Sequence, residues 1–268
     1  GFIENMQNIL DLNGKVGLVT GAGQGVGRQI ALHLGAHNAG GVIVNDFHLE
    51  RAEAVAAEIE KAGGKAIPLQ GDVSDFESVA QMVNVGNQHF GKIDIIVNNA
   101  GNSGANPELV ERGVPFWESN PESWDPWLDV NLRGVLNCCR ATIPGMVERK
   151  EGRIITIMSD AGRVGEQGLE VYSAAKAGAA GLMRALARSL GRYMITANTV
   201  AIAATNTPAI TARLEDEEVL RKMLSYYVIR RVGEPSDVAN MALFLASDAS
   251  SWITGQTYPV NGGYSFNL

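Results

Sequence analysis

The chain of 268 residues has little of what marks secretion, a membrane or a metal cluster. Its two cysteines, Cys138 and Cys139, are adjacent, and neighbours on a helix point in different directions, so no disulfide framework is expected. The longest apolar runs, such as Ile93–Val97, are too short to cross a bilayer. No basic segment followed by an apolar one opens the chain. We therefore expect a cytoplasmic protein with no membrane partner.

Basic residues are outnumbered by acidic ones. The chain has 22 Lys plus Arg and 29 Asp plus Glu, so its net charge is −7, and it has no basic tract. Nucleic-acid binding is therefore not expected. Hydrophobic residues make up 46% and charged residues 19%, which is typical of a globular protein and excludes extensive disorder. Prolines are few, 9 against 31 glycines, and the glycines gather at the ends of apolar runs.

Short apolar runs alternate with helical patterns along the chain. The runs show little polar alternation, which is typical of parallel strands buried on both faces. The predicted strands are Lys15–Thr20, Val42–Asp46, Ala66–Gln70, Ile93–Asn98, Arg153–Ser159, Ile195–Ala201 and Thr257–Val260. The predicted helices are Gly25–Asn38, Leu49–Ala62, Asp75–Phe90, Pro121–Val147, Val171–Tyr193 and Pro235–Ala246. This order predicts a single-domain α/β fold, a Rossmann-type doubly wound parallel sheet of about seven strands with helices on both faces.

The sequence indicates one domain without a linker or repeat. We expect residues 12–268 to form a single dinucleotide-binding catalytic domain, preceded by an N-terminal extension, 1–11, of which 1–5 could be a remnant. The segment 102–120 is predicted to be a long surface loop. The segment 205–229 is predicted to be a loop with a mobile helical pair. Long loops at the carboxyl ends of strands are where this fold places substrate contacts, so both are candidate substrate loops.

A glycine-rich turn follows the first predicted strand, in the pattern T-G-x-x-x-G-x-G over Thr20–Gly27. The strict G-x-G-x-x-G fingerprint does not fit, because Val26 stands five places after Gly21. We expect Gly21 to permit the tight turn and Gly25 to let backbone N–H groups approach a pyrophosphate. Gly27 would allow close packing of helix on strand, and the phosphates would lie at the positive end of the helix.

An acidic residue ends the second predicted strand, and another follows the third. Asp46 lies about 20 residues beyond the turn, where a carboxylate binds the ribose hydroxyls of an adenosine and repels a 2′-phosphate. The next residue is Phe47 and not a cation, so the sequence favours NAD over NADP. Asp72, followed by Val73, comes just after the third strand and is positioned for the adenine edge. The alternative for Asp46 is an ordinary loop aspartate.

Tyr172 and Lys176 are four residues apart on one predicted helix, so they share a face. A tyrosine has a pKa of about 10, and a nearby ammonium group is expected to lower it toward the working pH. Such a proton acceptor is what oxidation of an alcohol requires. Ser159 ends the fifth strand just before this helix and could hold the substrate oxygen. By itself, this tyrosine and lysine spacing is common on solvated helices.

These motifs together resemble the short-chain dehydrogenase/reductase family. The resemblance covers the chain from about Leu12. Its motifs are the glycine-rich turn, Asn98-Asn99-Ala100-Gly101, Asn131, Ser159, Tyr172-Ser173-Ala174-Ala175-Lys176, and the C-terminal stretches Arg231–Pro235, Thr254–Gln256 and Asn261–Gly263. The resemblance implies that Tyr172 is the catalytic acid and base, that Lys176 lowers its pKa and binds the nicotinamide ribose, and that Ser159 orients the substrate oxygen. It implies that Asn131 holds a water in a proton relay.

The resemblance also implies an NAD cofactor and a set of residues that line its cleft. These are Gly21, Gln24, Gly25, Val26, Gly27, Asp46, Phe47, Asp72, Val73, Asn98, Ala100, Gly101, Tyr172, Lys176 and Thr207. One departure concerns the nicotinamide loop, where Ile202 and Ala203 stand in place of the family's usual Pro-Gly pair.

The expected function is that of an oxidoreductase that transfers a hydride between NAD(H) and a secondary alcohol or ketone, with an alicyclic compound or a hydroxyacyl-CoA as possible substrate. The alternative is a non-catalytic subunit or binding protein with an altered nicotinamide loop. The resemblance implies a homo-oligomer, commonly a tetramer.

Three further features were weighed and given structural interpretations. His33 and His37 are four apart, a spacing that metal ligands use, but no third ligand accompanies them, so no metal is expected. Arginines recur every four residues at 184, 188 and 192; an exposed or subunit-facing stripe is favoured over a site for an anionic substrate handle. Tryptophans flank the first long loop, and substrate contact is left open for Trp117.

Overall fold

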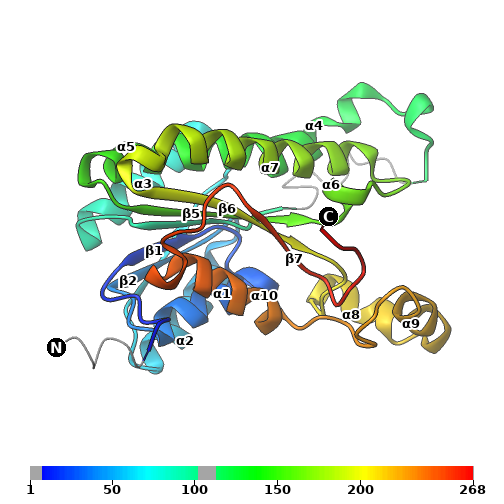
Figure 1. Cartoon of the computed structure of the whole chain (residues 1–268), viewed down its shortest axis with the longest axis horizontal. Coiled ribbons are helices and arrows are strands. Elements are labelled where there is room, and N and C mark those ends of the chain that lie inside the picture. Colours follow the sequence, from blue (N-terminus) through cyan, green and yellow to red (C-terminus); the bar gives the residue numbers. More distant parts are fainter. Residues whose placement is uncertain (1–7, 102–112, 268) are drawn as a thin grey trace.

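A single parallel sheet organises the molecule (Figure 1). The computed structural model describes residues 8–101 and 113–267. The sheet has seven strands in the order β3-β2-β1-β4-β5-β6-β7. The strands are β1 (Val16–Val19), β2 (Gly41–Asp46), β3 (Ala66–Gln70), β4 (Ile95–Asn98), β5 (Gly152–Ser159), β6 (Ile195–Ile202) and β7 (Thr257–Val260). All six pairings are parallel, which confirms the predicted Rossmann-type α/β fold.

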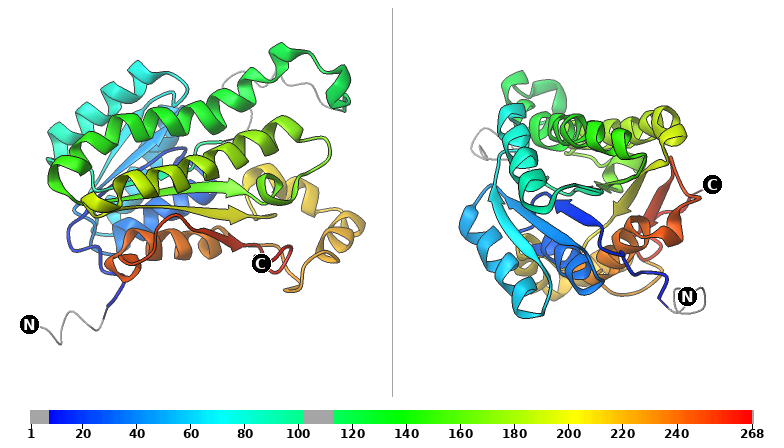
Figure 2. Two further views of the ribbon diagram at one scale, coloured as in Figure 1. Left: turned by 45° about the horizontal axis from the view of Figure 1, so that its top comes forward. Right: turned by 90° about the vertical axis from the view of Figure 1, so that its left-hand side faces the viewer.

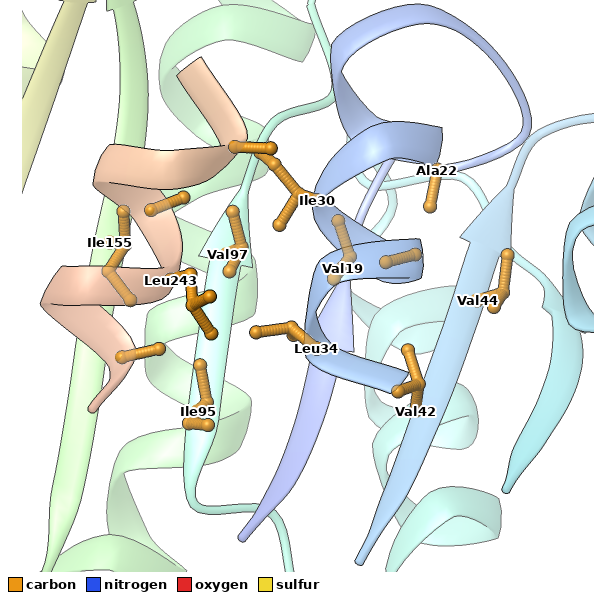
Figure 3. Packing of buried hydrophobic residues seen from close by; sticks show 14 of the residues in the cluster. Val19, Ala22, Ile30, Leu34, Val42, Val44, Ile95, Val97, Ile155 and Leu243 are labelled. Atoms are coloured by element: carbon orange, nitrogen blue, oxygen red, sulfur yellow. The ribbon is translucent and has the colours of Figure 1, made fainter. Parts of the chain in front are cut away.

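Helices cover both faces of this sheet, as Figures 1 and 2 show. One face carries α1 (Gly25–Ala36), α2 (Leu49–Lys61) and α10 (Pro235–Ala246), and the other carries α3 (Phe76–Phe90), α5 (Gly134–Arg149) and α7 (Glu170–Leu190). Each layer buries its own apolar cluster against the strands. Figure 3 shows the first, in which Ile30 and Leu34 of α1 and Leu243 of α10 pack on Val19, Val97 and Ile155. Such double coverage explains why the strands are almost uniformly apolar.

The strand order reverses at β1, whose neighbours are β2 on one side and β4 on the other. The connections from β1 and from β4 therefore leave toward opposite sides of the sheet, the topology that leaves a crevice beyond the carboxyl ends of such strands. In open α/β sheets this switch point is where ligands bind. The glycine-rich turn after β1 and the Asn98–Gly101 segment after β4 both lie there.

The predicted helix Pro121–Val147 is wrong as a single element. It consists of a 3-10 turn, η4 (Pro121–Ser123), then α4 (Asp125–Leu128), a π-helical turn, η5 (Asp129–Arg133), and α5. A proline sits in the first turn of both η4 and α4, where its missing N–H has no intrahelical partner to lose. Each proline thus starts a short new helix.

Of the two predicted loops, the first is only partly described and the second contains two helices. Within 102–120, residues 102–112 lie outside the described residues, and Phe116–Glu118 form a 3-10 turn, η3. The segment 205–229 contains two helices, α8 (Pro208–Leu214) and α9 (Glu217–Leu224). A further short helix, α6 (Ala161–Val164), follows β5 and was not predicted. Of the expected extension 1–11, residues 1–7 are also outside the described part.

The helices do not have the character of membrane spans in the described part of the chain. In residues 8–101 and 113–267, no helix combines the length and apolarity that a membrane span requires. Cys138 and Cys139 are buried free thiols of α5.

Candidate active site

The glycine-rich turn has bare backbone at three glycines beyond the end of β1. Gly21 and Gly25 adopt φ of +59° and +58°, a conformation that favours glycine. A Cβ on Gly27 would lie 2.3 Å from the carbonyl oxygen of Gly21, so only glycine lets α1 approach the turn this closely. Gln24 precedes the first turn of α1 and makes no side-chain cap. The helix N-terminus therefore presents uncapped N–H groups, which fit an anionic phosphate.

Thr20 and Asn99 hold this turn in place. The Thr20 hydroxyl accepts hydrogen bonds from the backbone N–H groups of Asn99 and Ala100, both at 3.0 Å. The Asn99 amide donates to the carbonyls of Thr20 and Gly21, both at 3.1 Å. The sequence motif contains Asn99 but does not by itself predict this role. Because it buttresses the glycine-rich turn, Asn99 is a positioning residue.

Asp46 closes one side of the crevice. Its buried carboxylate accepts hydrogen bonds from the backbone N–H of Gly23 and of His48, both at 3.0 Å. A Cβ on Gly23 would lie 2.6 Å from Asp46 Oδ2 and 2.5 Å from Cβ of Arg51, so Gly23 permits this close approach. The structure thus brings Asp46 against the glycine-rich turn, and also brings a cation, Arg51, into the same region. Phe47 is 45% exposed beside them.

Asp72 and Val73 lie at the next strand end. Oδ1 of Asp72 accepts hydrogen bonds from the backbone N–H and the hydroxyl of Ser74, at 2.9 and 2.6 Å. Val73 is buried, and its carbonyl accepts a 2.8 Å hydrogen bond from Asn137 of α5. The Asp72 carboxylate is therefore held in a local turn at the rim, while the Val73 side chain packs inward.

Asn98 and Asn99 point to opposite sides of β4. The Asn98 amide donates to the Thr156 hydroxyl at 3.2 Å and to Cys139 Sγ at 3.7 Å, deep between the sheet and α5. Asn98 is 4% exposed, so its side chain braces the strand from beneath the crevice. Ala100 meets the turn, since a Cβ on Gly21 would lie 2.9 Å from Ala100 Cα.

Thr207 reaches the glycine-rich turn from the far side. A Cβ on Gly25 would lie 3.5 Å from Thr207 Cγ2, and Thr207 is the residue that precedes α8. The loop before it lacks the Pro-Gly pair but is well connected. Ile202 continues β6, its carbonyl accepting a 2.8 Å hydrogen bond from Asp160, and the Ala204 N–H donates to the Tyr227 hydroxyl at 3.0 Å.

Ser159, Tyr172 and Lys176 meet at the carboxyl end of β5. The Ser159 hydroxyl accepts a 3.1 Å hydrogen bond from the Ala161 N–H and is also hydrogen-bonded to the Tyr172 side chain. Lys176 Nζ lies 5.7 Å from the centre of the Tyr172 ring. It donates a 3.1 Å hydrogen bond to the Ile157 carbonyl of β5, which fixes the ammonium group beside the phenol.

Burial is the largest influence on both titratable groups. It raises the pKa of the Tyr172 phenol, which the hydrogen bond from Ser159 lowers and the carboxylate of Glu166 raises further. Burial lowers the pKa of Lys176 to about 8. The sequence predicts that Lys176 lowers the pKa of Tyr172 toward the working pH. In the structure, the pKa of Tyr172 is instead raised overall. Desolvation disfavours the charged form of each group, and at Tyr172 it outweighs the opposing hydrogen bond from Ser159.

Asn131 stands in the π-helical turn η5 and faces the same place. Its amide donates a 2.9 Å hydrogen bond to the Trp127 carbonyl one turn earlier. A Cβ on Gly101 would lie 3.1 Å from Asn131 Oδ1 and 3.4 Å from Lys176 Nζ. Gly101 thus leaves open a small polar space shared by both side chains. Single π-helical turns inside α-helices are frequent at functional sites.

A cavity of about 340 Å³ adjoins Tyr172 on the side of α4. Its walls include Phe116, Trp124, Trp127 and, from the segment before α7, Glu166 and Glu170. The substrate contact left open for Trp117 is not supported, since this side chain is 81% exposed and is not part of the wall. The structure therefore has a cavity directly beside the phenol that can hold an organic substrate.

The histidine pair and the arginine stripe lie away from Tyr172 and Lys176. His33 Nε2 is 2.9 Å from Asn240 Oδ1, and His37 Nδ1 is 2.7 Å from the His33 carbonyl. Within the described part of the chain, no three His, Cys, Asp or Glu side chains gather as a metal site. The stripe of three arginines is exposed on the C-terminal half of α7 and its extension, away from Tyr172.

Comparisons with known proteins bear on this geometry. A family model described as enoyl-(acyl carrier protein) reductase matches residues 21–265. The chain is 37% identical over 252 residues to the 3-oxoacyl-[acyl-carrier-protein] reductase FabG of Staphylococcus aureus, covering 93% of this chain and 97% of the relative. It is 38% identical over 256 residues to the (2S)-[(R)-hydroxy(phenyl)methyl]succinyl-CoA dehydrogenase subunit BbsD of Thauera aromatica, covering 96% and 98%.

A crystallographic relative agrees with these matches. A 7α-hydroxysteroid dehydrogenase solved with NADH and 7-oxo glycochenodeoxycholic acid superposes with a TM-score of 0.88 at 33% identity, covering 97% of this chain and 98% of the other. The chain belongs to the short-chain dehydrogenase/reductase family. As a short-chain dehydrogenase/reductase it is an oxidoreductase that acts on hydroxyl or keto groups and uses a nicotinamide cofactor.

Proposed function

We propose that this short-chain dehydrogenase/reductase interconverts a secondary alcohol and its ketone, with NAD(H) as the cofactor. The observation that carries the proposal is the meeting of Ser159, Tyr172 and Lys176 at the end of β5, beside both a substrate-sized cavity and the crevice of the glycine-rich turn. The cofactor, when bound, accepts or gives the hydride at its nicotinamide ring.

Each side chain then has a distinct task. Tyr172 takes the hydroxyl proton during alcohol oxidation and returns it during ketone reduction. Ser159, already hydrogen-bonded to Tyr172, holds the substrate oxygen within reach of that phenol. Lys176 contributes positive charge beside Tyr172 and binds the ribose of the nicotinamide half. Asn131, which shares the space above Gly101 with Lys176, holds a water that passes protons from Lys176 to solvent.

The crevice fits the dinucleotide. The uncapped N-terminus of α1 and the side-chain-free wall at Gly21, Gly25 and Gly27 suit a pyrophosphate, with Thr207 opposite. Gln24 and Val26 complete this wall, and Ala100 and Gly101 continue it toward Tyr172. Asp46 would bind the adenosine ribose hydroxyls and disfavour a 2′-phosphate, which is why we propose NAD, although Arg51 nearby acts in the opposite direction. Phe47, Asp72 and Val73 would border the adenine, with Asn98 supporting the cleft from beneath. The 7α-hydroxysteroid dehydrogenase was solved in complex with NADH, which is consistent with this choice.

The test separates binding from turnover. Titration with NADH should quench tryptophan fluorescence in wild type and in Tyr172→Phe with similar affinity, because only a hydroxyl is removed. With a panel of cyclic secondary alcohols and aryl ketones, wild type should turn over and Tyr172→Phe should lose at least about 1,000-fold in kcat, in line with removal of a proton-transfer group. Tyr226→Phe, at an exposed tyrosine, is the matched control and should remain active.

A non-catalytic role remains the second candidate, since Ile202 and Ala203 replace the usual Pro-Gly pair. NADH binding without turnover of any panel member by wild type would favour it. We also propose that the active form is a cytoplasmic homotetramer, as the family resemblance implies. Light scattering of the purified protein should give four times the chain mass, and a monomer at micromolar concentration would contradict this.

A further inference from the structure

The wall of the cavity beside Tyr172 is aromatic. Phe116 and Trp124 are stacked, with ring centres 5.5 Å apart and planes inclined by 20°. Trp127 meets the Tyr172 ring edge to face, at 5.4 Å and 66°. The indole N–H of Trp124 is satisfied by a 2.9 Å hydrogen bond to the Ser119 hydroxyl, so this ring is held in place. Four rings around one space favour a flat or cyclic ligand, and their faces also attract cations.

Another part of the wall is acidic. Glu166 and Glu170 both line the cavity, from the turn after α6 and from the start of α7. Glu170 is held by a 3.1 Å hydrogen bond from the Gly168 N–H to its carboxylate. Glu166 lines the same cavity as Tyr172, and its negative charge raises the pKa of that phenol. A charged group of a substrate inside this cavity would interact with the same carboxylate.

The aromatic and acidic parts of the cavity wall come from different segments that pack together. The segment with α4 lies over the end of the molecule where α6 and α7 begin, as Figures 1 and 2 show, and α4 contacts α7. Tyr172 belongs to the first turn of α7 and therefore lies between them. A substrate carbonyl at this phenol places its substituents against both walls.

We infer that the substrate is a ring-bearing alcohol or ketone whose ring portion, which occupies this cavity, is neutral or cationic, and that Glu166 discriminates against carboxylate-bearing analogues. The inference rests on the proposed function for the position of the carbonyl. It goes further in naming the chemical class of the substrate and the side chain that selects it. Glu166 acts through space on the substrate charge and is a specificity-determining residue.

Three aryl ketones that differ in charge test the selection. They are (4-acetylphenyl)trimethylammonium, its neutral isostere 4′-tert-butylacetophenone, and 4-acetylbenzoate. For wild type, we expect kcat/KM to be at least about tenfold higher for the cation than for the anion. Glu166→Gln should reduce that ratio about fivefold, as expected for one carboxylate at the edge of solvent. Salt at about 1 M should reduce it similarly, because the carboxylate is exposed to screening.

Glu122→Gln is the matched control, since Glu122 is an exposed carboxylate of η4 that is not part of the cavity wall. It should leave the ratio unchanged. The inference is overturned if wild type turns over all three ketones alike or prefers the anion, or if Glu166→Gln and Glu122→Gln behave identically.

Binding of the same ketones can be measured by quenching of tryptophan fluorescence. This measurement separates the inference from the proposed function. Charge-dependent binding that Glu166→Gln weakens, without turnover of any ketone, supports the charge selection and counts against the reductase proposal. Turnover of the ketones without charge dependence supports the reductase proposal and counts against the charge selection. Failure of all three ketones to bind overturns the inference.

Discussion

Replacing Lys176 by methionine removes a buried charge, and we expect it to stabilise the protein. The residue is 6% exposed, and its ammonium group makes one hydrogen bond, at 3.1 Å, to the Ile157 carbonyl. Its pKa falls from 10.5 to about 8 because burial penalises the charged form. Methionine fills a similar linear volume without a charge.

The size of this stabilisation follows from the lowered pKa of Lys176. A difference of about 2.5 pKa units corresponds to about 3 kcal/mol of lost stability at pH 7, at about 1.36 kcal/mol per unit. Loss of the hydrogen bond to Ile157 offsets about 1 kcal/mol of the gain. The Lys176→Met variant should therefore unfold with a free energy about 2 kcal/mol higher than wild type at pH 7, while losing most of its activity.

The difference in unfolding free energy between Lys176→Met and wild type should depend on pH. Between pH 8 and pH 10.5 the folded protein binds fewer protons at Lys176 than the unfolded chain does, so wild type gains stability as pH rises. The advantage of the variant should fall from about 2 kcal/mol at pH 7 to about zero at pH 9.5. Urea unfolding of both proteins at both pH values, at one protein concentration and without cofactor, measures this.

A matched control is Lys65→Met, at an exposed lysine, which should change stability little and equally at both pH values. A Lys176→Met variant less stable than wild type at pH 7, or a margin that is the same at pH 7 and pH 9.5, would refute the reasoning.

Three further outcomes are expected. Gly27→Ala should destabilise the protein by at least about 2 kcal/mol in urea unfolding and weaken NADH binding at least about tenfold, because its Cβ would lie 2.3 Å from the Gly21 carbonyl oxygen. Asp46→Asn should shift the ratio of NADPH to NADH affinity at least about fivefold toward NADPH in fluorescence titrations; an unchanged ratio would remove the argument for NAD. Arg163→Met should cost about 3 kcal/mol, because it leaves the buried carboxylate of Asp160 without its 2.9 Å ion pair, and adding Asp160→Asn should restore part of that loss.

Much of the fold follows from local patterns. Apolar runs such as Ile154–Met158 read directly as strands buried on both faces, and the structure places them inside the sheet. The interruption before α5 could not be read in the same way. The apolar spacing continues through Asp129–Arg133, and nothing in it separates a π-helical turn from an α-helical one. Pro121 and Pro126 were the available signal for the two earlier helix starts.

The site was predictable where it depends on spacing and unpredictable where it depends on packing. The interval from Tyr172 to Lys176 placed both side chains on one helix face, and they do meet. The net rise of the Tyr172 pKa depends on burial by distant segments, which no local pattern encodes. The sequence did contain a signal for the role of Asn99. Successive side chains of a strand point to opposite faces, and the neighbouring Asn98 points inward, so Asn99 points toward the glycine-rich turn.

Deuterium transfer tests the central claim most directly. Wild type should convert 4′-tert-butylacetophenone and NADH labelled with deuterium at the transferred C4 position into an alcohol that carries one deuterium at the carbinol carbon, detected by mass spectrometry. Tyr172→Phe, with NADH bound as tightly, should form almost none of this product. An alcohol without deuterium, or labelled alcohol formed by the variant at the wild-type rate, would contradict the account.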